Sequence, residues 1–379
     1  TIFTNIYCIL WMKGKKINIP GYKPRVLVAP LDWGLGHSTR SIPVINGLIK
    51  QGCEVIIASS GAGRFLLEKE FPGLLFLHLR GYEVRYSVNG YWMPVKLFMQ
   101  IPKIIGRIYK EHSWLKDAVK EYSIDAVISD NRLGMYHSSD PCAYITHQLK
   151  IKTGSRLTER IARKIHYWFI NKYDECWVPD MQQEINLAGE LSHPASLPKT
   201  PVKYLGLLSR FENGLAEKKY DLLIMLSGPE PQRTVFEEMV LMGLKNYTGQ
   251  ALLVRGLPQN TEVIKTVLPT FEIKNHLSAT ELNRVILQSR VIICRCGYST
   301  IMDLVKLQRN AILVPAPGQT EQEYLAAYLH KQKLFFCVNQ DMFSLANVLE
   351  KADDFVFNKQ VFSQNDHEKV IAGFVSNLL

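Results

Sequence analysis

The chain has few cysteines and no long hydrophobic run, and each shortage excludes a class of protein. Seven cysteines are spread over 379 residues without framework spacing, so we expect reduced thiols and a cytoplasmic protein. The apolar patch near residue 10 is too short to span a bilayer and lacks the flanks of a signal peptide. Because Met12 just precedes the first predicted strand, we expect residues 1–11 to lie outside the working protein.

Acidic residues are fewer than basic residues. Lys and Arg outnumber Asp and Glu by 45 to 35, which gives a formal net charge of +10. A basic surface favours nucleic acid, acidic lipid headgroups or phosphorylated substrates, so charge alone does not identify the partner. The sequence lacks the contiguous Lys/Arg block of nucleic-acid-binding arms, and we expect no nucleic-acid partner.

Two common nucleotide motifs and a common metal motif are missing. The chain contains no Walker A sequence, and the loop Ala29–Arg40 lacks the third glycine of the dinucleotide fingerprint. Cys294 and Cys296 stand one residue apart without a second cysteine pair, whereas structural zinc needs four ligands. Their spacing also departs from the redox C-x-x-C motif. We therefore expect no metal site.

What the sequence does contain is an alternation of short apolar runs with helical patterns. Near-continuous hydrophobicity is typical of parallel strands buried on both faces. The first series of predicted strands is Arg25–Pro30, Cys53–Ser59, Leu74–Leu79, Asp125–Ser129, Cys142–Thr146 and Glu175–Pro179. The second is Asp221–Leu226, Ala251–Arg255, Val291–Cys294, Ala311–Pro315 and Leu334–Val338. Two such series predict an α/β protein with two doubly wound, Rossmann-like domains, residues 22–200 and 218–360, joined within His193–Tyr220.

Ligands of such sheets bind beyond the carboxyl ends of the strands, so the loops there hold the candidate site. His37 follows the first strand between small residues, where a general base is well placed, and Asp130 at the end of the fourth could orient it. Ser38 and Thr39 could cap the next helix. The alternatives are a helix-capping His and a turn-forming Asp. His147, after the fifth strand, is a further candidate.

The second series has its own candidate loops. Ser227 and Gly228 leave room for backbone N–H groups to face a phosphate. Gly297, followed by hydroxyl-bearing Ser299 and Thr300 at a helix start, favours an anion, and Asp303 one turn later could bind a diol. Together these features describe a nucleotide ribose-phosphate site. The polar side chains of Glu321–Gln322–Glu323 could bind sugar hydroxyls. The alternative is that they form the ordinary acidic first turn of a helix.

The stretch "CRCGYSTIMD" resembles the nucleotide-sugar loop C-R-S-G-x-x-T-x-x-E of GT-B glycosyltransferases of family 28, the MurG-like enzymes. The resemblance places Arg295 and Cys296 beside the nucleotide and Asp303 on the ribose. "VPAPGQTEQEYLAA" is similar to the segment that holds the donor sugar, with Glu321 and Gln322 as the polar pair. By the same comparison His276–Leu277 would lie at the uracil, and the loop carrying Gly36 and His37 resembles the family's N-terminal glycine-rich loop.

This resemblance implies a GT-B fold and a hexosyltransferase of the cell envelope. Such a transfer needs a base for the acceptor hydroxyl, and our candidate catalytic residues are His37 and, to orient it, Asp130, for which the family offers no assigned counterpart. The resemblance also implies inverting, metal-independent transfer of a hexosyl group, with N-acetylglucosamine as a candidate, from a UDP-sugar to a hydroxyl acceptor. No cofactor is expected beyond the donor. A C-terminal helix within residues 361–379 would pack back on the first domain. Two alternatives stay open: the UDP-sugar hydrolase of the pseudaminic-acid pathway, which "D-x-G-x-G-H-x-x-R" also resembles, and a non-catalytic nucleotide-sugar-binding subunit.

Tyr91–Tyr122 bears on the acceptor, because it mixes aromatic and aliphatic residues with several Lys and Arg. A basic, aromatic amphipathic segment is typical of peripheral contact with a membrane surface. The alternative is a core-packing helix with a solvated basic face. Since MurG-like enzymes use lipid-linked acceptors at the inner face of the membrane, we expect peripheral association there and a lipid-linked acceptor.

Overall fold

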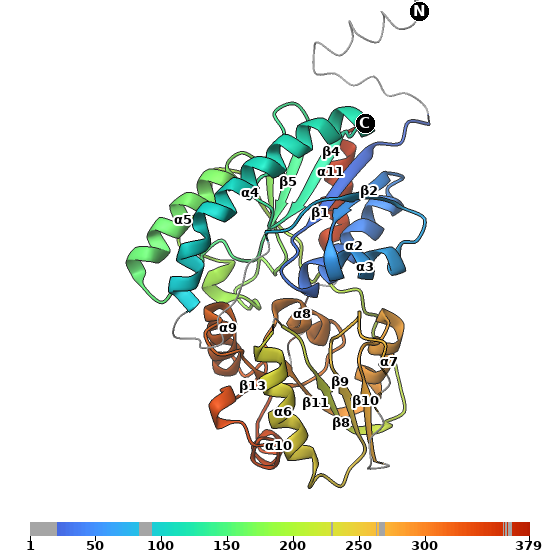
Figure 1. Ribbon diagram of the computed structural model, residues 1–379, viewed down its shortest axis with the longest axis vertical. Coiled ribbons are helices and arrows are strands. Elements are labelled where there is room, and N and C mark those ends of the chain that lie inside the picture. The colour runs from blue at the N-terminus through green and yellow to red at the C-terminus, as the bar shows by residue number, and fades with distance from the viewer. Residues whose placement is uncertain are drawn as a thin grey trace, which may run out of the picture.

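The computed structural model describes residues 21–82, 93–228, 230–262, 264, 270–358, 360, 362 and 366–379, with side chains of 93–99 and 101 left out. Two parallel sheets, each covered by helices on both faces, lie one above the other (Figure 1). This confirms the prediction of two doubly wound, Rossmann-like sheets. The domain boundaries 22–200, 218–360 and 361–379 stay a prediction.

The first sheet has 7 strands in the order β3-β2-β1-β4-β5-β6-β7, and every neighbouring pair is parallel. Its central strands are almost wholly buried, as the apolar runs of the sequence require. The strands are β1 (Arg25–Pro30), β2 (Glu54–Ser59), β3 (Leu75–His78), β4 (Ala126–Asp130), β5 (Cys142–Ile145), β6 (Glu175–Val178) and β7 (Val202–Tyr204).

Helices cover this sheet on both sides because successive residues of a strand face opposite ways. Val26 and Val28 pack in the core with α2 and α3, whereas Leu27 and Ala29 pack in the core with α4 and α5. The helices are α2 (Leu35–Lys50), α3 (Gly61–Glu70), α4 (Met93–Tyr122) and α5 (Arg156–Ile170), with a 3₁₀ turn, η3, at Gly189–Leu191.

The second sheet has 6 strands in the order β10-β9-β8-β11-β12-β13, again all parallel. Its strands are β8 (Tyr220–Met225), β9 (Ala251–Val254), β10 (Phe271–Lys274), β11 (Ser289–Arg295), β12 (Ile312–Val314) and β13 (Phe336–Cys337). Its helices are α6 (Gln232–Leu244), α7 (Ala279–Gln288), α8 (Tyr298–Lys306), α9 (Thr320–Lys331) and α10 (Leu345–Asp353), with a 3₁₀ turn, η4, at Gln340–Met342.

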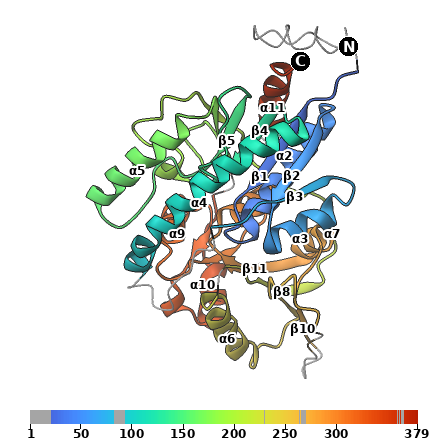
Figure 2. The same cartoon turned by 45° about the horizontal axis from the view of Figure 1, so that its top comes forward.

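Apolar residues join the two domains. Leu205, Leu207 and Leu208 follow β7, are buried, and belong to one core cluster with residues of both sheets. The last helix, α11 (Asp366–Ser376), lies against α2, where the Ile371 side chain sits over Gly47. In both views α11 is seen among the elements of the first domain (Figures 1 and 2). The chain therefore crosses between the domains twice.

Some local predictions were wrong. Helix α2 begins at Leu35 after Gly34, so Ser38 and Thr39 lie inside the helix and cannot cap it. Gly34 has φ 79°, a conformation that glycine adopts at little cost, and it lets the chain turn into the helix early. Strands β7 and β10 were not predicted because both are short and only partly buried.

Candidate active site

The predicted catalytic pair lies at the carboxyl edge of the first sheet. His37 is in the first turn of α2, directly after β1, and Asp130 is the last residue of β4. The parallel register sets Pro30 opposite Asp130, so the two loops start side by side. The Nδ1 atom of His37 lies 3.0 Å from Oδ1 of Asp130. The fold thus brings together two side chains that are 93 residues apart in the chain.

Arg40 completes this cluster, and our sequence analysis gave it no role. Its Nε donates to Oδ2 of Asp130 at 2.6 Å, and its Nη2 donates to Oδ1 of the same carboxylate. Its Nη1 lies 3.0 Å from Nδ1 of His147. The available signal was spacing, since Arg40 follows His37 by three residues and shares its face of the helix. The guanidinium therefore ties the catalytic pair to the loop after β5.

The proton on His37 is assigned from its hydrogen-bond network. Its Nδ1 lies 3.0 Å from Asp130 and 2.9 Å from the Arg40 guanidinium. The carboxylate calls for an Nδ1–H, whereas the guanidinium could donate only to an unprotonated Nδ1. Because the same Nη2 already donates to Asp130, we assign an Nδ1–H that donates to the carboxylate. This leaves Nε2 with its lone pair, and the imidazole side chain remains 14% exposed. Neutral His37 thus presents a proton acceptor.

The charges around this imidazole favour that neutral form. Burial, and then the Arg40 guanidinium, lower the pKa of His37 below its usual 6.5 against the opposing effect of Asp130. Burial alone would raise the pKa of Asp130, but Arg40 and His37 outweigh it and hold that pKa well below its usual range. At neutral pH the cluster therefore contains a neutral base and an ionised carboxylate.

A carboxylate of the second domain joins the same cluster. Oε1 of Glu321, in the first turn of α9, lies 2.6 Å from Nε2 of His147, and its Oε2 accepts from Nε2 of Gln148. The His147 ring also stacks on Tyr298 of α8, with centroids 4.1 Å apart and planes 5° from parallel. A continuous chain of polar side chains therefore links the catalytic pair to the second domain.

The first turns of α2 and α8 also meet across the two domains. Oγ of Ser299 donates to the backbone oxygen of Gly36 at 2.9 Å. A Cβ on Gly36 would lie 3.0 Å from that Oγ, so a larger residue would have to displace the Ser299 side chain slightly. Neither Gly34 nor Gly297, the residues that precede the two helices, provides a side-chain cap. Predicted residues Gly36, Gly297, Ser299 and Thr300 thus gather where two helix N-termini face one another.

Asp303, the predicted ribose ligand, lies in α8 against the segment that connects the domains. It accepts a hydrogen bond of 2.5 Å from Oγ of Ser209. Burial raises the pKa of Asp303 to about 6, although the Arg210 guanidinium and Ser209 act in the opposite direction. The carboxylate is therefore easier to protonate than an ordinary aspartate.

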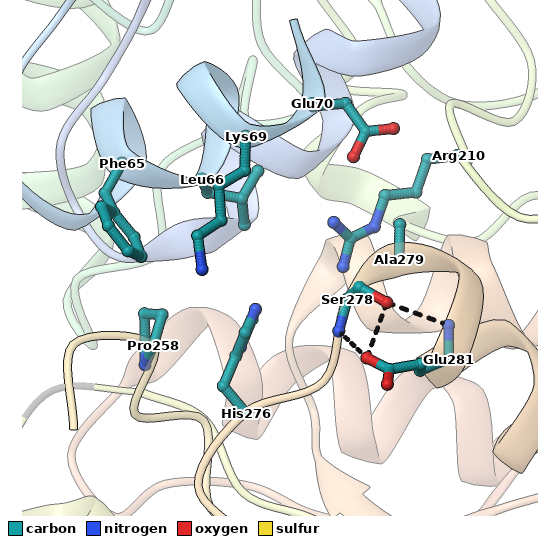
Figure 3. Close-up of a pocket in the computed structure, with 10 residues that line it drawn as sticks. All are labelled: Phe65, Leu66, Lys69, Glu70, Arg210, Pro258, His276, Ser278, Ala279 and Glu281. Atoms are coloured by element: carbon teal, nitrogen blue, oxygen red, sulfur yellow. Dashed lines mark hydrogen bonds between the residues drawn. The ribbon is translucent and has the colours of Figure 1, made fainter. Parts of the chain in front are cut away.

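A pocket of about 270 Å³ lies beside Arg210, between α3 of the first domain and the loops before α7 (Figure 3). Lys69, Arg210 and His276 supply its positive or protonatable groups. Nε of Arg210 is buried without a hydrogen-bond partner among the described residues. Burial and the charges of Arg210 and Lys69 lower the pKa of His276. The other lining residues are Phe65, Leu66, Glu70, Pro258, Ser278, Ala279 and Glu281.

Two predicted donor contacts, Arg295 and Cys296, are buried. Nη2 of Arg295 donates to the Gln232 backbone oxygen at 2.7 Å, and its guanidinium lies over the Phe236 ring. The thiols of Cys294 and Cys296 are buried and free, and burial raises the pKa of both. Across the described residues, no three His, Cys, Asp or Glu side chains are grouped to hold a metal ion.

The other predicted residues lie on second-domain loops. Gln322 accepts from the Ala316 N–H at 3.0 Å and donates to Gln319, so its amide is engaged within its own loop. Leu277 is a buried core residue beside His276. Ser227 and Gly228 are exposed in the turn after β8, the strand that pairs with β11.

Two family models match the chain. Residues 254–377 match the glycosyltransferase family 28 C-terminal domain, and residues 26–147 match glycosyl transferase family 1. No curated protein matches the sequence.

Solved structures match over nearly the whole chain. The kitacinnamycin glycotransferase is 14% identical with a TM-score of 0.60, and 94% of this chain and 95% of that chain are covered. Spinosyn forosaminyltransferase SpnP is 11% identical over 94% and 95%, with a TM-score of 0.57. MurG of Acinetobacter baumannii is 12% identical over 94% and 99%, with a TM-score of 0.51. At such identities the likeness shows the fold, and together with the family matches it identifies this chain as a GT-B glycosyltransferase whose C-terminal domain belongs to family 28.

Proposed function

We propose that this enzyme transfers a hexosyl group from a UDP-sugar to an acceptor hydroxyl, with inversion and without a metal ion. The observation that carries the proposal is the His37–Asp130 pair, held at 3.0 Å where the first turns of α2 and α8 meet. A base on one domain and two helix N-termini at the same junction are what such a transfer needs.

The chemical step follows from the assigned proton positions. Nε2 of His37 removes the proton of the acceptor hydroxyl, while Asp130 stabilises the imidazolium that forms. The acceptor oxygen bonds to the anomeric carbon from the face opposite the diphosphate. The bond between that carbon and the diphosphate oxygen breaks, and its electron pair leaves with UDP. One displacement of this kind inverts the anomeric configuration.

The departing diphosphate requires positive groups, which the backbone can supply. The N-termini of α2 and α8 each carry N–H groups without a side-chain cap, and helix dipoles add partial positive charge there. Ser299 and Thr300 add hydroxyls at the start of α8. The turn at Ser227–Gly228 follows the strand next to β11, and both residues are exposed, so it offers further backbone N–H groups. These dipoles support a mechanism without a divalent ion.

The nucleoside fits the pocket beside Arg210. We assign the uracil to the space between His276 and Lys69, because a pyrimidine ring carries carbonyl oxygens that the N–H groups of these side chains can bind (Figure 3). Asp303 then binds the ribose hydroxyls in place of Ser209. Glu321 and Gln322 are assigned to the sugar, with N-acetylglucosamine as the first donor to test. Both must exchange the hydrogen bonds they now make.

The described residues give less information about where the acceptor binds. The membrane contact predicted for Tyr91–Tyr122 falls partly outside them, since residues 83–92 and the side chains of 93–99 and 101 are not described. No described helix is long and apolar enough to cross a membrane. A lipid-linked hydroxyl acceptor remains part of the proposal.

A screen of nucleotide sugars tests the function directly. Thermal unfolding with a panel of UDP-, dTDP- and GDP-sugars should show a raised Tm with a UDP-sugar alone or most strongly, without added metal and in the presence of EDTA. Sugar release from that donor should be slow without acceptor. Rapid release with water as acceptor would instead identify a UDP-sugar hydrolase. Stabilisation by GDP-sugars alone would contradict the proposed donor.

A further inference from the structure

His147 is a buried residue that contacts both domains, and it has no role in the reaction proposed above. It follows β5 in the first domain and is only 3% exposed. Its two ring nitrogens have different partners: Nδ1 lies 3.0 Å from Nη1 of Arg40, and Nε2 lies 2.6 Å from Oε1 of Glu321. One imidazole therefore lies between the guanidinium beside the proposed base and a carboxylate assigned to the donor sugar.

These two partners determine where the proton of the His147 ring lies. The Arg40 guanidinium can only donate, so Nδ1 accepts its hydrogen bond. Burial alone would raise the pKa of Glu321, but His147, Arg40 and His37 outweigh it and lower that pKa. The ionised carboxylate can only accept, so Nε2 of His147 carries the hydrogen. The ring is therefore neutral, and it accepts on one side and donates on the other.

The hydrogen bonds of this ring belong to one chain that crosses from the second domain to the base. Glu321 accepts from His147, and His147 accepts from Arg40. Arg40 donates in turn to Asp130, whose Oδ1 lies 3.0 Å from Nδ1 of His37. A single imidazole thus connects the proposed sugar ligand with the group that holds the base.

Packing fixes this imidazole more firmly than its carboxylate partner. The His147 ring stacks on Tyr298, with centroids 4.1 Å apart and planes 5° from parallel. Tyr298 is itself buried, and its hydroxyl donates to the Pro179 backbone oxygen at 2.8 Å. The Glu321 side chain, in contrast, is 33% exposed. A ligand can therefore reach the carboxylate, while the histidine stays in place.

We propose that His147 is a positioning residue with two separate tasks: its Nδ1 holds Arg40 for the base, and its Nε2–H occupies Glu321 until the donor sugar binds there. This inference rests on the proposed function, because it uses the assignment of Glu321 to the sugar. A sugar hydroxyl that binds Glu321 must first break the bond from His147, so that bond lowers the apparent affinity for the donor. Arg40 keeps its acceptor throughout, so the base stays assembled while the donor enters.

Two substitutions separate the two sides of the ring. The asparagine amide lies near the position of Nδ1 and the glutamine amide near that of Nε2, and either amide can accept or donate. His147→Asn therefore loses the bond to Glu321, and a UDP-sugar should bind about tenfold more tightly than to wild type. His147→Gln loses the acceptor for Arg40, so its kcat should be about tenfold lower than that of His147→Asn, with a wild-type Kd for the UDP-sugar.

Calorimetry with UDP-N-acetylglucosamine and with UDP gives the readout. UDP has no sugar that competes for Glu321, so its Kd should be the same in His147→Asn as in wild type. Gln148→Ala should also tighten binding of the UDP-sugar, because Nε2 of Gln148 donates to Oε2 of the same carboxylate. Tyr328→Phe is the matched control: it removes another hydrogen bond between the domains, from α9 to the Asn186 backbone oxygen at 3.3 Å, and should change neither Kd nor kcat.

A double-mutant cycle tests the same contact without any nucleotide sugar. In the ligand-free full-length chain, the losses of Tm in His147→Asn and Glu321→Ala should be less than additive, because either change breaks the same hydrogen bond. The losses in Tyr328→Phe and Glu321→Ala should be additive, because these changes break different bonds.

Three results would overturn the proposal. The losses of Tm in His147→Asn and Glu321→Ala could be additive, or His147→Asn could bind the UDP-sugar no more tightly than wild type. Alternatively, the Asn and Gln variants could lose kcat and affinity to the same extent, which indicates that His147 only supports the fold. If wild type binds no UDP-sugar, the proposed donor is wrong, and the ligand-free cycle alone decides for or against the His147–Glu321 contact.

Discussion

The two halves of the proposed site differ in whether their side chains already hold the arrangement that the reaction needs. On the first domain, His37, Asp130 and Arg40 already hold one another in hydrogen bonds suited to catalysis. On the second domain, the groups assigned to the donor are engaged elsewhere: Glu321 with His147, and Asp303 with Ser209. The proposed base is therefore preorganised, whereas a donor bound as proposed displaces existing hydrogen bonds.

This difference predicts where substitutions act. Preorganised groups contribute to the transition state, so changing them should lower kcat and leave donor affinity nearly unchanged. Groups that exchange partners contribute to binding, so changing them should alter Kd and KM first. The contrast would disappear if substitutions in both halves changed kcat and Kd together.

The largest effect is expected for His37→Ala. Loss of the general base should lower kcat by about 10²–10⁴-fold, while the Kd for UDP measured by calorimetry stays within about twofold. Added imidazole should restore part of the rate, because it can occupy the vacated space. His112→Ala is the control, since that histidine stacks on Tyr136 outside the site. Full activity in His37→Ala would reject the base assignment.

Arg40 should have the next largest effect, through the pKa of its neighbour. Its charge lowers the pKa of His37, so Arg40→Gln should raise that pKa. Because a neutral base is required, the acid limb of the kcat/KM profile should move to higher pH. Arg40→Lys keeps the charge without the two-pronged contact to Asp130, so it should lower kcat with little shift of the limb.

A purely structural role of Arg40 makes a different prediction. Arg40→Gln leaves Asp130 with less compensation, and the free energy of unfolding should fall by about 3–5 kcal/mol. If stability falls while the acid limb stays in place, Arg40 only supports the fold.

The sequence predicted the sheets well because buried parallel strands form short, nearly continuous apolar runs in the sequence. Strand β1 was predicted with its observed bounds, since every residue from Val26 to Pro30 is buried and apolar. Short edge strands do not form such apolar runs. Strand β7 has only three partly buried residues, and it lay inside the predicted connection between domains.

The site was harder to predict in full. His37 and Asp130 could be brought together from the sequence because each follows a strand whose neighbours are fixed by topology, and their catalytic role stays a prediction. Ser209 was not assigned a role, because its partner lies 94 residues away and nothing local reveals the contact. Arg40 was also not assigned one, since Asp130 lies 90 residues away and its spacing from His37 was the local signal. Arg295 is the opposite case: its motif position predicts a donor contact, which stays a prediction, while its side chain is buried against the Gln232 carbonyl.

Donor affinity should depend on the ionisation of Asp303. Its pKa is raised to about 6, and only the ionised form accepts both ribose hydroxyls. The Kd for the UDP-sugar should therefore rise as pH falls through about 6, and Asp303→Asn should weaken binding by about tenfold and remove this dependence. A UDP-sugar is preferable to UDP, whose terminal phosphate titrates in the same range. Unchanged affinity in Asp303→Asn would contradict the ribose assignment.

The smallest effect is expected at Lys69, which tests whether the first domain helps to bind the donor. Its side chain enters the pocket from α3, opposite His276 of the second domain (Figure 3). Lys69→Met should raise the Kd for UDP by up to about fivefold with kcat unchanged, because a partly solvated cation contributes at most about 1 kcal/mol. Lys50→Met is the matched control, since Lys50 is exposed on α2 and pairs with Glu368 at 3.2 Å. If Lys69→Met binds UDP as tightly as Lys50→Met, the Lys69 cation does not contact the nucleoside.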